Sequence, residues 1–340
     1  MPYRSCWNIE NASINFNGSV DNGSKFIAFC CEPIGTRPAI AFDETAEQTA
    51  RRFLELRTDM IDLSKTKDTA LCDGCAGCTH YKLDEHDKAD GTIHYINLSM
   101  YPAPCQSNCF YCGFNQRGQT KYKKTEAAER GYEKLFGMLE YYDDNNLISK
   151  EARWQISTGE IAIHPYKDRI LDLVNDQEAE FRTNCFIFDE GIAKNLNSNP
   201  KSFINLSIDS GTPETWYKIK RVDNFYDVTD NLVSYYMNCT RTGQITLKYI
   251  ILPGVNDNMR DYESLVEIMN ILEVQNLTLS REMSSKYNST QQQRTNLVIA
   301  TAYLAAVLMK NGKTFDFHHG YTEQERDIIL TKCENLTISL

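Results

Sequence analysis

The sequence predicts an α/β fold in which helices cover a mostly parallel sheet. Beyond residue 90, short apolar runs alternate with longer amphipathic stretches, and this alternation is typical of parallel strands joined by helical crossovers. The expected strands are, in chain order, Ile93–Met100, Trp154–Thr158, Glu180–Phe188, Phe203–Asp209, Gln244–Leu252 and Leu277–Leu279. The helices expected between them are Glu126–Tyr142, Asp168–Asn175, Asp189–Leu196, Asp227–Met237 and Met259–Leu272. Such strand–helix units fit an open, partial barrel or a flat doubly wound sheet, and their periodicity does not distinguish the two.

The first 90 residues have a different pattern, and we expect a small β-rich extension there. Apolar and polar residues alternate over Ser13–Cys31 around Asn17-Gly18, which is typical of a β-hairpin or a small meander. A helix is expected from Thr45 to about Leu56. The polar, turn-rich stretch Asp84–Gly91 is expected to end this extension.

The end of the chain is expected to form a helical cap. An apolar helix over Thr295–Met309 precedes a strand over Thr314–Phe317. A final helix begins at Thr322, which forms a capping box with Glu325. The expected division is therefore an N-terminal extension over 1–90, a main domain over 91–285 and a cap over 286–340.

Composition and charge exclude several classes of function. The 340 residues include 36 Lys or Arg and 46 Asp or Glu, a net charge of −10, so nucleic acid, which is bound through basic surfaces, is not an expected partner. The longest apolar stretch, Ile299–Met309, is shorter than the roughly 20 residues that cross a membrane. Residues Met1–Trp7 contain no apolar core or cleavage site of an export signal. We therefore expect a cytoplasmic protein without a membrane partner.

The twelve cysteines include a tight group of three. In a reducing cytosol cysteines bind metals or react more often than they form disulfides. The run Cys105-Gln-Ser-Asn-Cys109-Phe-Tyr-Cys112 follows the first expected strand of the main domain. Three thiolates at this spacing can each bind one iron of a four-iron cluster and leave the fourth iron open to a small molecule. A zinc site is the alternative, and its fourth ligand would have to come from elsewhere in the chain.

With Tyr111 before the third cysteine, this run resembles the signature of the radical S-adenosylmethionine (SAM) superfamily. The resemblance implies a partial (β/α)6 barrel, a [4Fe–4S] cluster held by Cys105, Cys109 and Cys112, and SAM bound to that cluster with Tyr111 against the adenine. Ser157-Thr158-Gly159-Glu160 is similar to the Gly-Gly-Glu motif of the superfamily, although Thr158 replaces the first Gly. By this resemblance Glu160 binds the amino group of SAM, through a charge-assisted hydrogen bond.

Three further segments extend the resemblance. Leu206–Glu214 is similar to a Ser-Leu-Asp-Gly segment, which implies that Ser207 and Asp209 hold the ribose, and strand alternation points both to the same side. Arg182-Thr183-Asn184 looks like a Thr-Asn-Gly element that shapes the barrel. Leu252–Asp257 resembles a Pro-Gly-x-Asn-Asp turn of several groups in the superfamily.

A second cysteine group lies in the N-terminal extension. Cys72, Cys75 and Cys78 resemble cluster-binding runs of the ferredoxin type, and the extension also resembles the SPASM domain, which normally follows the barrel. We expect a second, auxiliary [4Fe–4S] cluster held by these three cysteines with Cys30 or Cys31. A zinc ribbon built from the same residues is the alternative.

The function that the resemblance implies is reductive cleavage of SAM to a 5′-deoxyadenosyl radical, which abstracts a hydrogen from a substrate. We expect a peptide or a sugar-type small molecule, with dehydrogenation or epimerisation as the outcome, and a flavodoxin- or ferredoxin-type electron donor. The alternatives are an enzyme that places a glycyl radical on a partner protein, and a non-enzymatic iron–sulfur electron carrier or zinc scaffold. Methyl transfer to RNA is a third possibility, which the acidic charge disfavours.

Overall fold

Parallel strands joined by helices make up most of the described chain, so the predicted α/β fold class is confirmed. This computed structural model describes residues 4–19, 27–28, 39–40, 45–66, 81–83, 91–116, 121–157, 159–282, 290–318 and 320–337. The chain divides into two units, one made of 1–104 with 119–181 and the other of 105–118 with 182–340. Among the described strands the sheet is open and does not close into a barrel.

The first unit contains four parallel strands in the order β8-β7-β6-β2, and the short strands β3 and β4 extend them in antiparallel pairing. Its strands are β1 (Arg4–Cys6), β2 (Ile14–Ser19), β3 (Ile27–Ala28), β4 (Ala39–Ile40), β5 (Tyr81–Leu83), β6 (Ile93–Tyr101), β7 (Ile148–Ile156) and β8 (Glu178–Arg182), of which β1 pairs with β5. Its helices are α1 (Trp7–Glu10), α2 (Ala46–Thr66), α4 (Glu126–Asp144), the short 3₁₀ helix η2 (Ile161–Ile163) and α5 (Lys167–Val174).

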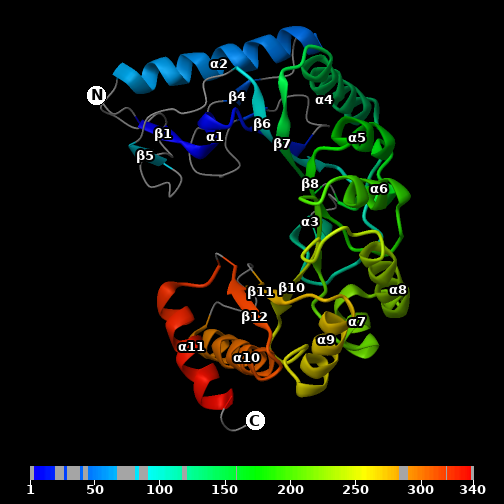
Figure 1. The fold of residues 1–340 in the computed structure, drawn as a ribbon, viewed down its shortest axis with the longest axis vertical. Helices are drawn as coiled ribbons and strands as arrows, with labels where there is room; N and C mark the ends of the chain where they lie inside the picture. The colour runs from blue at the N-terminus through cyan, green and yellow to red at the C-terminus, as the bar shows by residue number, and fades with distance from the viewer. Residues whose placement is uncertain are drawn as a thin grey trace. The chain divides into compact units, whose positions relative to one another are not determined.

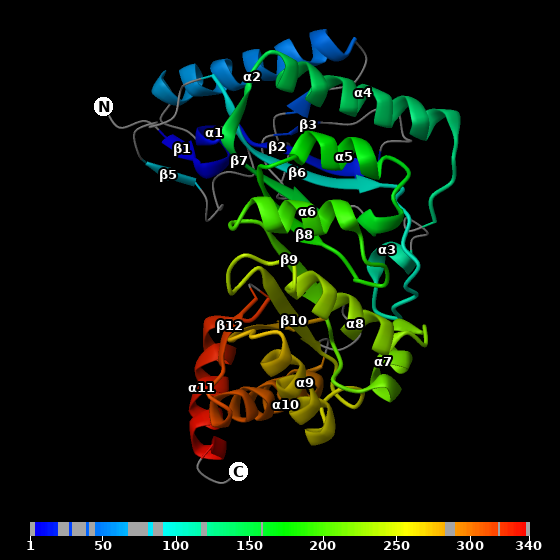
Figure 2. The same ribbon diagram turned by 45° about the vertical axis from the view of Figure 1, so that its right-hand side comes forward.

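Amphipathic helices cover the strands of this unit. Helix α4 packs side by side with α2 (Figure 1), and α4 and α5 lie on the same side of β6 and β7 (Figure 2). Tyr132, Phe136 and Leu139 of α4 are fully buried, at the spacing that puts them on one helix face. Thr125 caps this helix by accepting a hydrogen bond from the Ala128 N–H at 3.2 Å.

The second unit holds four parallel strands in the order β12-β11-β10-β9. They are β9 (Phe203–Ser207), β10 (Ile245–Ile251), β11 (Asn276–Arg281) and β12 (Thr314–Phe317). The helices are α3 (Gly113–Gln116), α6 (Glu190–Ser198), α7 (Pro213–Lys220), α8 (Phe225–Tyr236), α9 (Met259–Ile271), α10 (Gln291–Lys310) and α11 (Glu323–Thr337). The C-terminal segment therefore adds a paired strand as well as two helices, and α10 packs along α11 (Figure 1).

Two predicted strands end earlier than the sequence pattern indicates. Strand β8 stops at Arg182, because the chain turns at Cys185, which has a φ of +56°. Strand β9 stops at Ser207, because Asp209 has a φ of +54°, in the left-handed region. The structure also contains α7, a helix that the sequence analysis does not predict.

No helix in the part of the chain that the structure describes is both long and apolar enough to span a bilayer.

Candidate functional site

The cysteine trio lies on the loop that follows β6 and leads into α3. All three thiols are half-buried, and none of them forms a disulfide with another described residue. The Asn184 side-chain amide lies 3.7 Å from Cys105 Sγ, and the Asn115 N–H donates to Cys112 Sγ at 3.4 Å. The Ser107 hydroxyl lies 2.9 Å from Cys109 Sγ. Each sulfur therefore has a polar neighbour.

The chemistry of these donors fits an iron–sulfur cluster. Among the described residues, no three His, Cys, Asp or Glu side chains gather closely enough to hold a single metal ion. A four-iron cluster does not require such a gathering, because each thiolate binds a different iron. Hydrogen bonds to the cysteine sulfurs are one of the features by which proteins set the potential of such clusters, and the sulfurs of Cys105 and Cys112 accept such bonds.

The cysteine loop is fixed to the end of α7. The Asn108 N–H donates to the Lys220 carbonyl at 3.0 Å, and the Phe110 N–H donates to the Ile219 carbonyl at 3.2 Å. An apolar cluster secures the loop further: Phe110 and Tyr111, together with Val255, pack against the buried side chains of Ile219, Ile250 and Leu252. Both kinds of contact hold the chain between the first and third cysteines, so the loop has a defined path before any cofactor binds.

Asp209 and Lys220 form a buried ion pair beneath Tyr111. Lys220 Nζ lies 2.6 Å from Asp209 Oδ2, and the two side chains are 6% and 0% exposed. The Tyr111 hydroxyl donates to the same carboxylate oxygen at 2.5 Å. Burial, followed by the charge of Asp209, raises the pKa of Tyr111 well above its ordinary value, so the phenol stays protonated and remains a donor.

Ser207 and Asp209, the predicted ribose contacts, have different backbone conformations: Ser207 is in a strand and Asp209 is in the left-handed region. Ser207 is the last residue of β9, so the alternation that was expected to align the two side chains ends before Asp209. The second carboxylate oxygen of Asp209 accepts a hydrogen bond from the Ile250 N–H at 2.8 Å. Asn256 secures the backbone there, because its amide donates to the Asp209 carbonyl at 2.8 Å. The role of Ser207 and Asp209 toward SAM stays a prediction.

Glu160 is fully buried in the first unit, just after β7. Its carboxylate accepts a hydrogen bond from the Ala162 N–H at 3.2 Å, and its own N–H donates to the Pro104 carbonyl at 2.7 Å. Gly159 before it has a φ of +60°, and a Cβ there would overlap the Pro104 carbonyl. The motif is therefore packed against the residue that precedes Cys105 in the chain. Thr158 lies outside the described residues.

His164 lies near Glu160 in sequence and is 4% exposed. Its Nε2 lies 3.3 Å from the Tyr132 hydroxyl, and its Nδ1 accepts from the Tyr166 N–H at 3.2 Å. Burial lowers the pKa of His164 to about 4, so the imidazole is neutral at pH 7. In this state it contributes to aromatic packing around Tyr132.

The expected auxiliary cluster falls on residues that the structure does not describe. Cys30, Cys31, Cys72, Cys75 and Cys78 all lie outside the described ranges, so this expectation stays a prediction.

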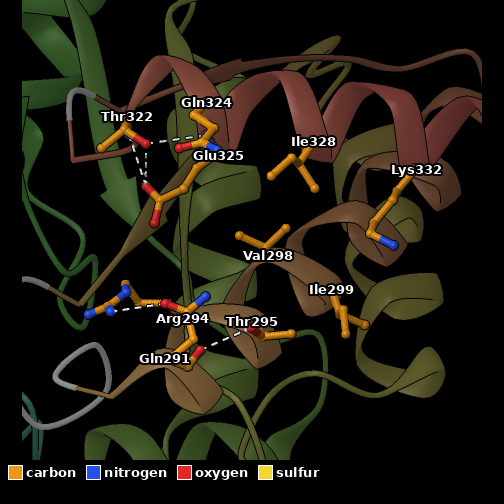
Figure 3. Close-up of a pocket in the computed structure, with 10 residues that line it drawn as sticks. All are labelled: Gln291, Arg294, Thr295, Val298, Ile299, Thr322, Gln324, Glu325, Ile328 and Lys332. Atoms are coloured by element: carbon orange, nitrogen blue, oxygen red, sulfur yellow. Dashed lines mark hydrogen bonds between the residues drawn. The ribbon is translucent and has the colours of Figure 1, made fainter.

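A pocket of about 430 Å³ lies between α10 and α11, and none of the predicted site residues lines it (Figure 3). Its central acid, Glu325, caps α11 through Thr322 and pairs with Arg281 at 2.9 Å. Gln291 and Arg294 bond to each other at 3.1 Å. Its polar side chains thus serve the packing of the two helices, and the pocket carries none of the chemistry expected of the cysteine loop.

Comparison with known proteins gives distant similarities only. No protein-family model matches the chain, and no curated protein sequence matches it. The solved structure of SuiB from Streptococcus suis bound to the precursor peptide SuiA is similar over 90% of this chain, with 11% identity and a TM-score of 0.48. The chain spans 60% of the length of SuiB.

Two other structures have lower scores. TsrM from Kitasatospora setae, a radical SAM methyltransferase with cobalamin and a [4Fe–4S] cluster bound, matches over 56% of this chain and 34% of its own, with 14% identity and a TM-score of 0.39. Methylornithine synthase (PylB) matches over 73% and 83%, with 11% identity and a TM-score of 0.37.

The site contains residues that sequence reasoning missed. Lys220 is buried against Asp209. Asn184 lies beside Cys105, whereas the resemblance of its motif implies only a part in shaping the barrel. For Asn184 the sequence does contain a signal, because this residue belongs to the Arg182-Thr183-Asn184 element, which lies at the end of β8. Lys220 follows Lys218 and precedes Arg221, and nothing in that basic run distinguishes a buried lysine from its exposed neighbours.

Proposed function

We propose that this chain is a radical SAM enzyme. The observation that carries the proposal is the cysteine loop: three thiols at the spacing of the superfamily signature, on a loop that follows a parallel strand, each with a polar neighbour at its sulfur. Cys105, Cys109 and Cys112 would hold a [4Fe–4S] cluster. When bound, the cluster and SAM supply a 5′-deoxyadenosyl radical that abstracts hydrogen from the substrate.

The residues of the chain have distinct parts in this proposal. Glu160 would bind the amino group of SAM, and its buried carboxylate is suited to a charge-assisted hydrogen bond with an ammonium group. Ser207 would contact the ribose, and the ring of Tyr111 would face the adenine. Asp209 would act here too, either on the ribose or through Tyr111, to which it is bonded.

For the reaction we propose hydrogen abstraction from a peptide or a sugar-type metabolite, with dehydrogenation or epimerisation as the outcome. The cysteines of the N-terminal extension support a second, auxiliary cluster in this proposal. Such a cluster would accept an electron from the substrate radical, which favours dehydrogenation. A flavodoxin- or ferredoxin-type protein would reduce the SAM-binding cluster, and we propose a cytoplasmic location, where cysteines bind metals more often than they form disulfides.

The test compares two cysteine variants after anaerobic reconstitution with iron and sulfide. One has Cys105, Cys109 and Cys112 all changed to Ala. The matched control is Cys239→Ala, because burial raises the pKa of the Cys239 thiol to about 11 and its hydrogen bond goes to a backbone carbonyl. The measurements are iron per chain and 5′-deoxyadenosine formed from SAM with a strong reductant.

We expect the wild type and Cys239→Ala to form 5′-deoxyadenosine, and the triple variant to form none. About four irons retained by the triple variant would support the auxiliary cluster, and loss of all iron would argue against it. A wild-type protein that binds iron but does not cleave SAM would contradict the enzyme proposal and favour an electron carrier. Cleavage by the triple variant would contradict the assignment of the cluster ligands.

A further inference from the structure

The ammonium group of Lys220 is buried and fully bonded within the second unit. Besides Asp209 Oδ2, it donates to the Ser207 carbonyl at 2.8 Å and to the Tyr111 hydroxyl oxygen at 3.3 Å. A lysine ammonium has three N–H donors, so this group has none left for a ligand. Lys220 therefore does not bind SAM in this arrangement, and its charge serves the interior of the protein.

The same lysine holds the cysteine loop by its backbone. Its carbonyl accepts from the Asn108 N–H, while its side chain contacts Tyr111, so the two ends of Lys220 bind residues on either side of Cys109. The ammonium lies 5.7 Å from the centre of the Tyr111 ring. One residue thus fixes the position of the loop and places a positive charge next to it.

The neighbours of Lys220 keep that charge in place. Burial lowers the pKa of Lys220, but Asp209, Cys109 and Cys105 raise it, and the net result lies above the ordinary value. The ammonium also donates to the Tyr111 hydroxyl oxygen, and Tyr111 lies between Cys109 and Cys112, so electrostatic interactions of this charge reach the cysteine loop. Inside a protein such interactions are stronger than in water, because the medium screens them less.

We propose that Lys220 is a positioning residue for the cluster loop and that its buried charge, held by Asp209, raises the reduction potential of the cluster at Cys105, Cys109 and Cys112. The inference rests on the proposed function, since it assumes that the trio binds a cluster. Reduction adds negative charge to the cluster, so a nearby cation favours the reduced form. Asp209 has the opposite effect, because its negative charge opposes reduction.

The experiment measures the midpoint potential of the cluster by redox titration followed by electron paramagnetic resonance, without SAM. Leaving SAM out removes any contact of Asp209 with the ribose from the result. The variants are Lys220→Met, Lys220→Arg, Asp209→Asn and the double variant Asp209→Asn/Lys220→Met. Lys218→Met is the matched control, because Lys218 lies on the same helix and is exposed. Iron per chain is measured for each variant.

We expect Lys220→Met to lower the equilibrium constant for reduction about tenfold, which is about 59 mV for one electron. Asp209→Asn should shift the potential in the opposite direction, and Lys220→Arg and Lys218→Met should stay near the wild type. Shifts of opposite sign in these two variants would indicate a charge effect, because structural damage to the loop would shift the midpoint potential of both in the same direction. A Lys220→Met protein that folds without a cluster, with the cluster restored in Lys220→Arg, would support the positioning role.

Shifts of the same sign in Lys220→Met and Asp209→Asn, or no shift in either, would overturn the inference. If Lys220→Met does not fold, the double variant decides: its potential must lie below that of Asp209→Asn, and an equal or higher value overturns the inference. Failure of the proposed function looks different, because the wild type itself would then show no cluster that depends on Cys105, Cys109 and Cys112.

Discussion

Two buried carboxylates organise the region after β9, and they are satisfied in different ways. Asp209 is paired with a cation, Lys220, and with a phenol. Asp261 of α9 is 1% exposed, and its donors among the described residues are uncharged. Its donors are the hydroxyls of Ser210, Thr212 and Thr215, the N–H groups of Gly211 and Thr212, and the Asn258 amide.

This difference distinguishes a carboxylate that stabilises the fold, Asp261, from one that also contacts the cysteine loop, Asp209. The hydrogen bonds of Asp261 join the turn before α7 to α9, and Gly211 is required there because a Cβ would overlap the Asp261 carbonyl. None of these partners contacts a cysteine in the trio. The partners of Asp209 include Tyr111, which lies between two of the cysteines. A change at Asp261 should therefore affect stability alone, whereas a change at Asp209 or Lys220 should also affect the cluster.

The largest effect on stability is expected for Asp261→Ala. The change leaves several buried donors without an acceptor, and each such donor costs about 1–3 kcal/mol. Because some of these donors can find other partners, we expect a loss of about 4 kcal/mol in the free energy of unfolding, measured by denaturant titration. Glu263→Ala, an exposed position on the same helix, is the control and should change stability by less than about 0.5 kcal/mol.

For Asp261→Ala protein that remains folded, iron per chain and the midpoint potential should match the wild type. A shift in potential as large as that of Lys220→Met would break the distinction between the two carboxylates. It would indicate that any disturbance of the segment between β9 and α7 reaches the cluster loop.

His164, a buried base bonded to the Tyr132 hydroxyl and the Tyr166 N–H, sharpens the comparison. Burial holds the pKa of His164 at about 4, below its ordinary value of 6.5, so between these values the unfolded chain binds a proton that the folded chain does not. Stability from this residue is complete above pH 6.5 and is lost as the pH falls toward 4. The expected loss is about 3 kcal/mol.

The measurement is the free energy of unfolding between pH 7 and pH 4.5 for the wild type and His164→Asn. Asparagine keeps an acceptor for the Tyr166 N–H and has no proton to gain, so the variant should be less stable at pH 7 and should depend less on pH. His94→Asn, at a half-buried position, is the control. An unchanged pH dependence in His164→Asn would show that other groups control acid unfolding.

The sequence predicts the parallel strands and most of the helices between them, because these elements depend on local patterns of apolar and polar residues. Ile93–Tyr101 and Ile245–Ile251 are short apolar runs that must be buried between helices, and their alternation with helices indicates parallel pairing. Helix α7 was missed because eight residues show little periodicity. Its start is marked nonetheless: Thr212 is the N-cap and Pro213 follows at the first helical position.

The candidate site is predictable where spacing carries the chemistry, as in the cysteine run, and not where tertiary packing does. Lys220 and Lys218 are alike in sequence, and only the packing of α7 makes one buried and the other exposed. Strand alternation also fails at Asp209, because its left-handed conformation arises from bonds that Ile250 and Asn256 make from a distant part of the chain.

The smallest effect tests whether the position of Asp209 matters apart from its charge. Asn256 donates to the carbonyls of Asp209 and Ile250 and accepts from the Leu252 N–H at 2.7 Å, so Asn256→Ala removes a buried bridge at the end of β10. We expect a loss of about 2 kcal/mol in the free energy of unfolding. Asp257→Ala is the matched control, because Asp257 is exposed and accepts a hydrogen bond within its own turn, from the Gly254 N–H.

The midpoint potential of Asn256→Ala separates two accounts of Asp209. If the charge of the Asp209–Lys220 pair sets the potential, the variant should keep the wild-type value, because both charges remain and the Ile250 N–H still binds the carboxylate. A potential that moves as far as in Asp209→Asn would instead show that the backbone position of Asp209 controls the loop. In that case Lys220 would act through geometry, and its charge would be secondary.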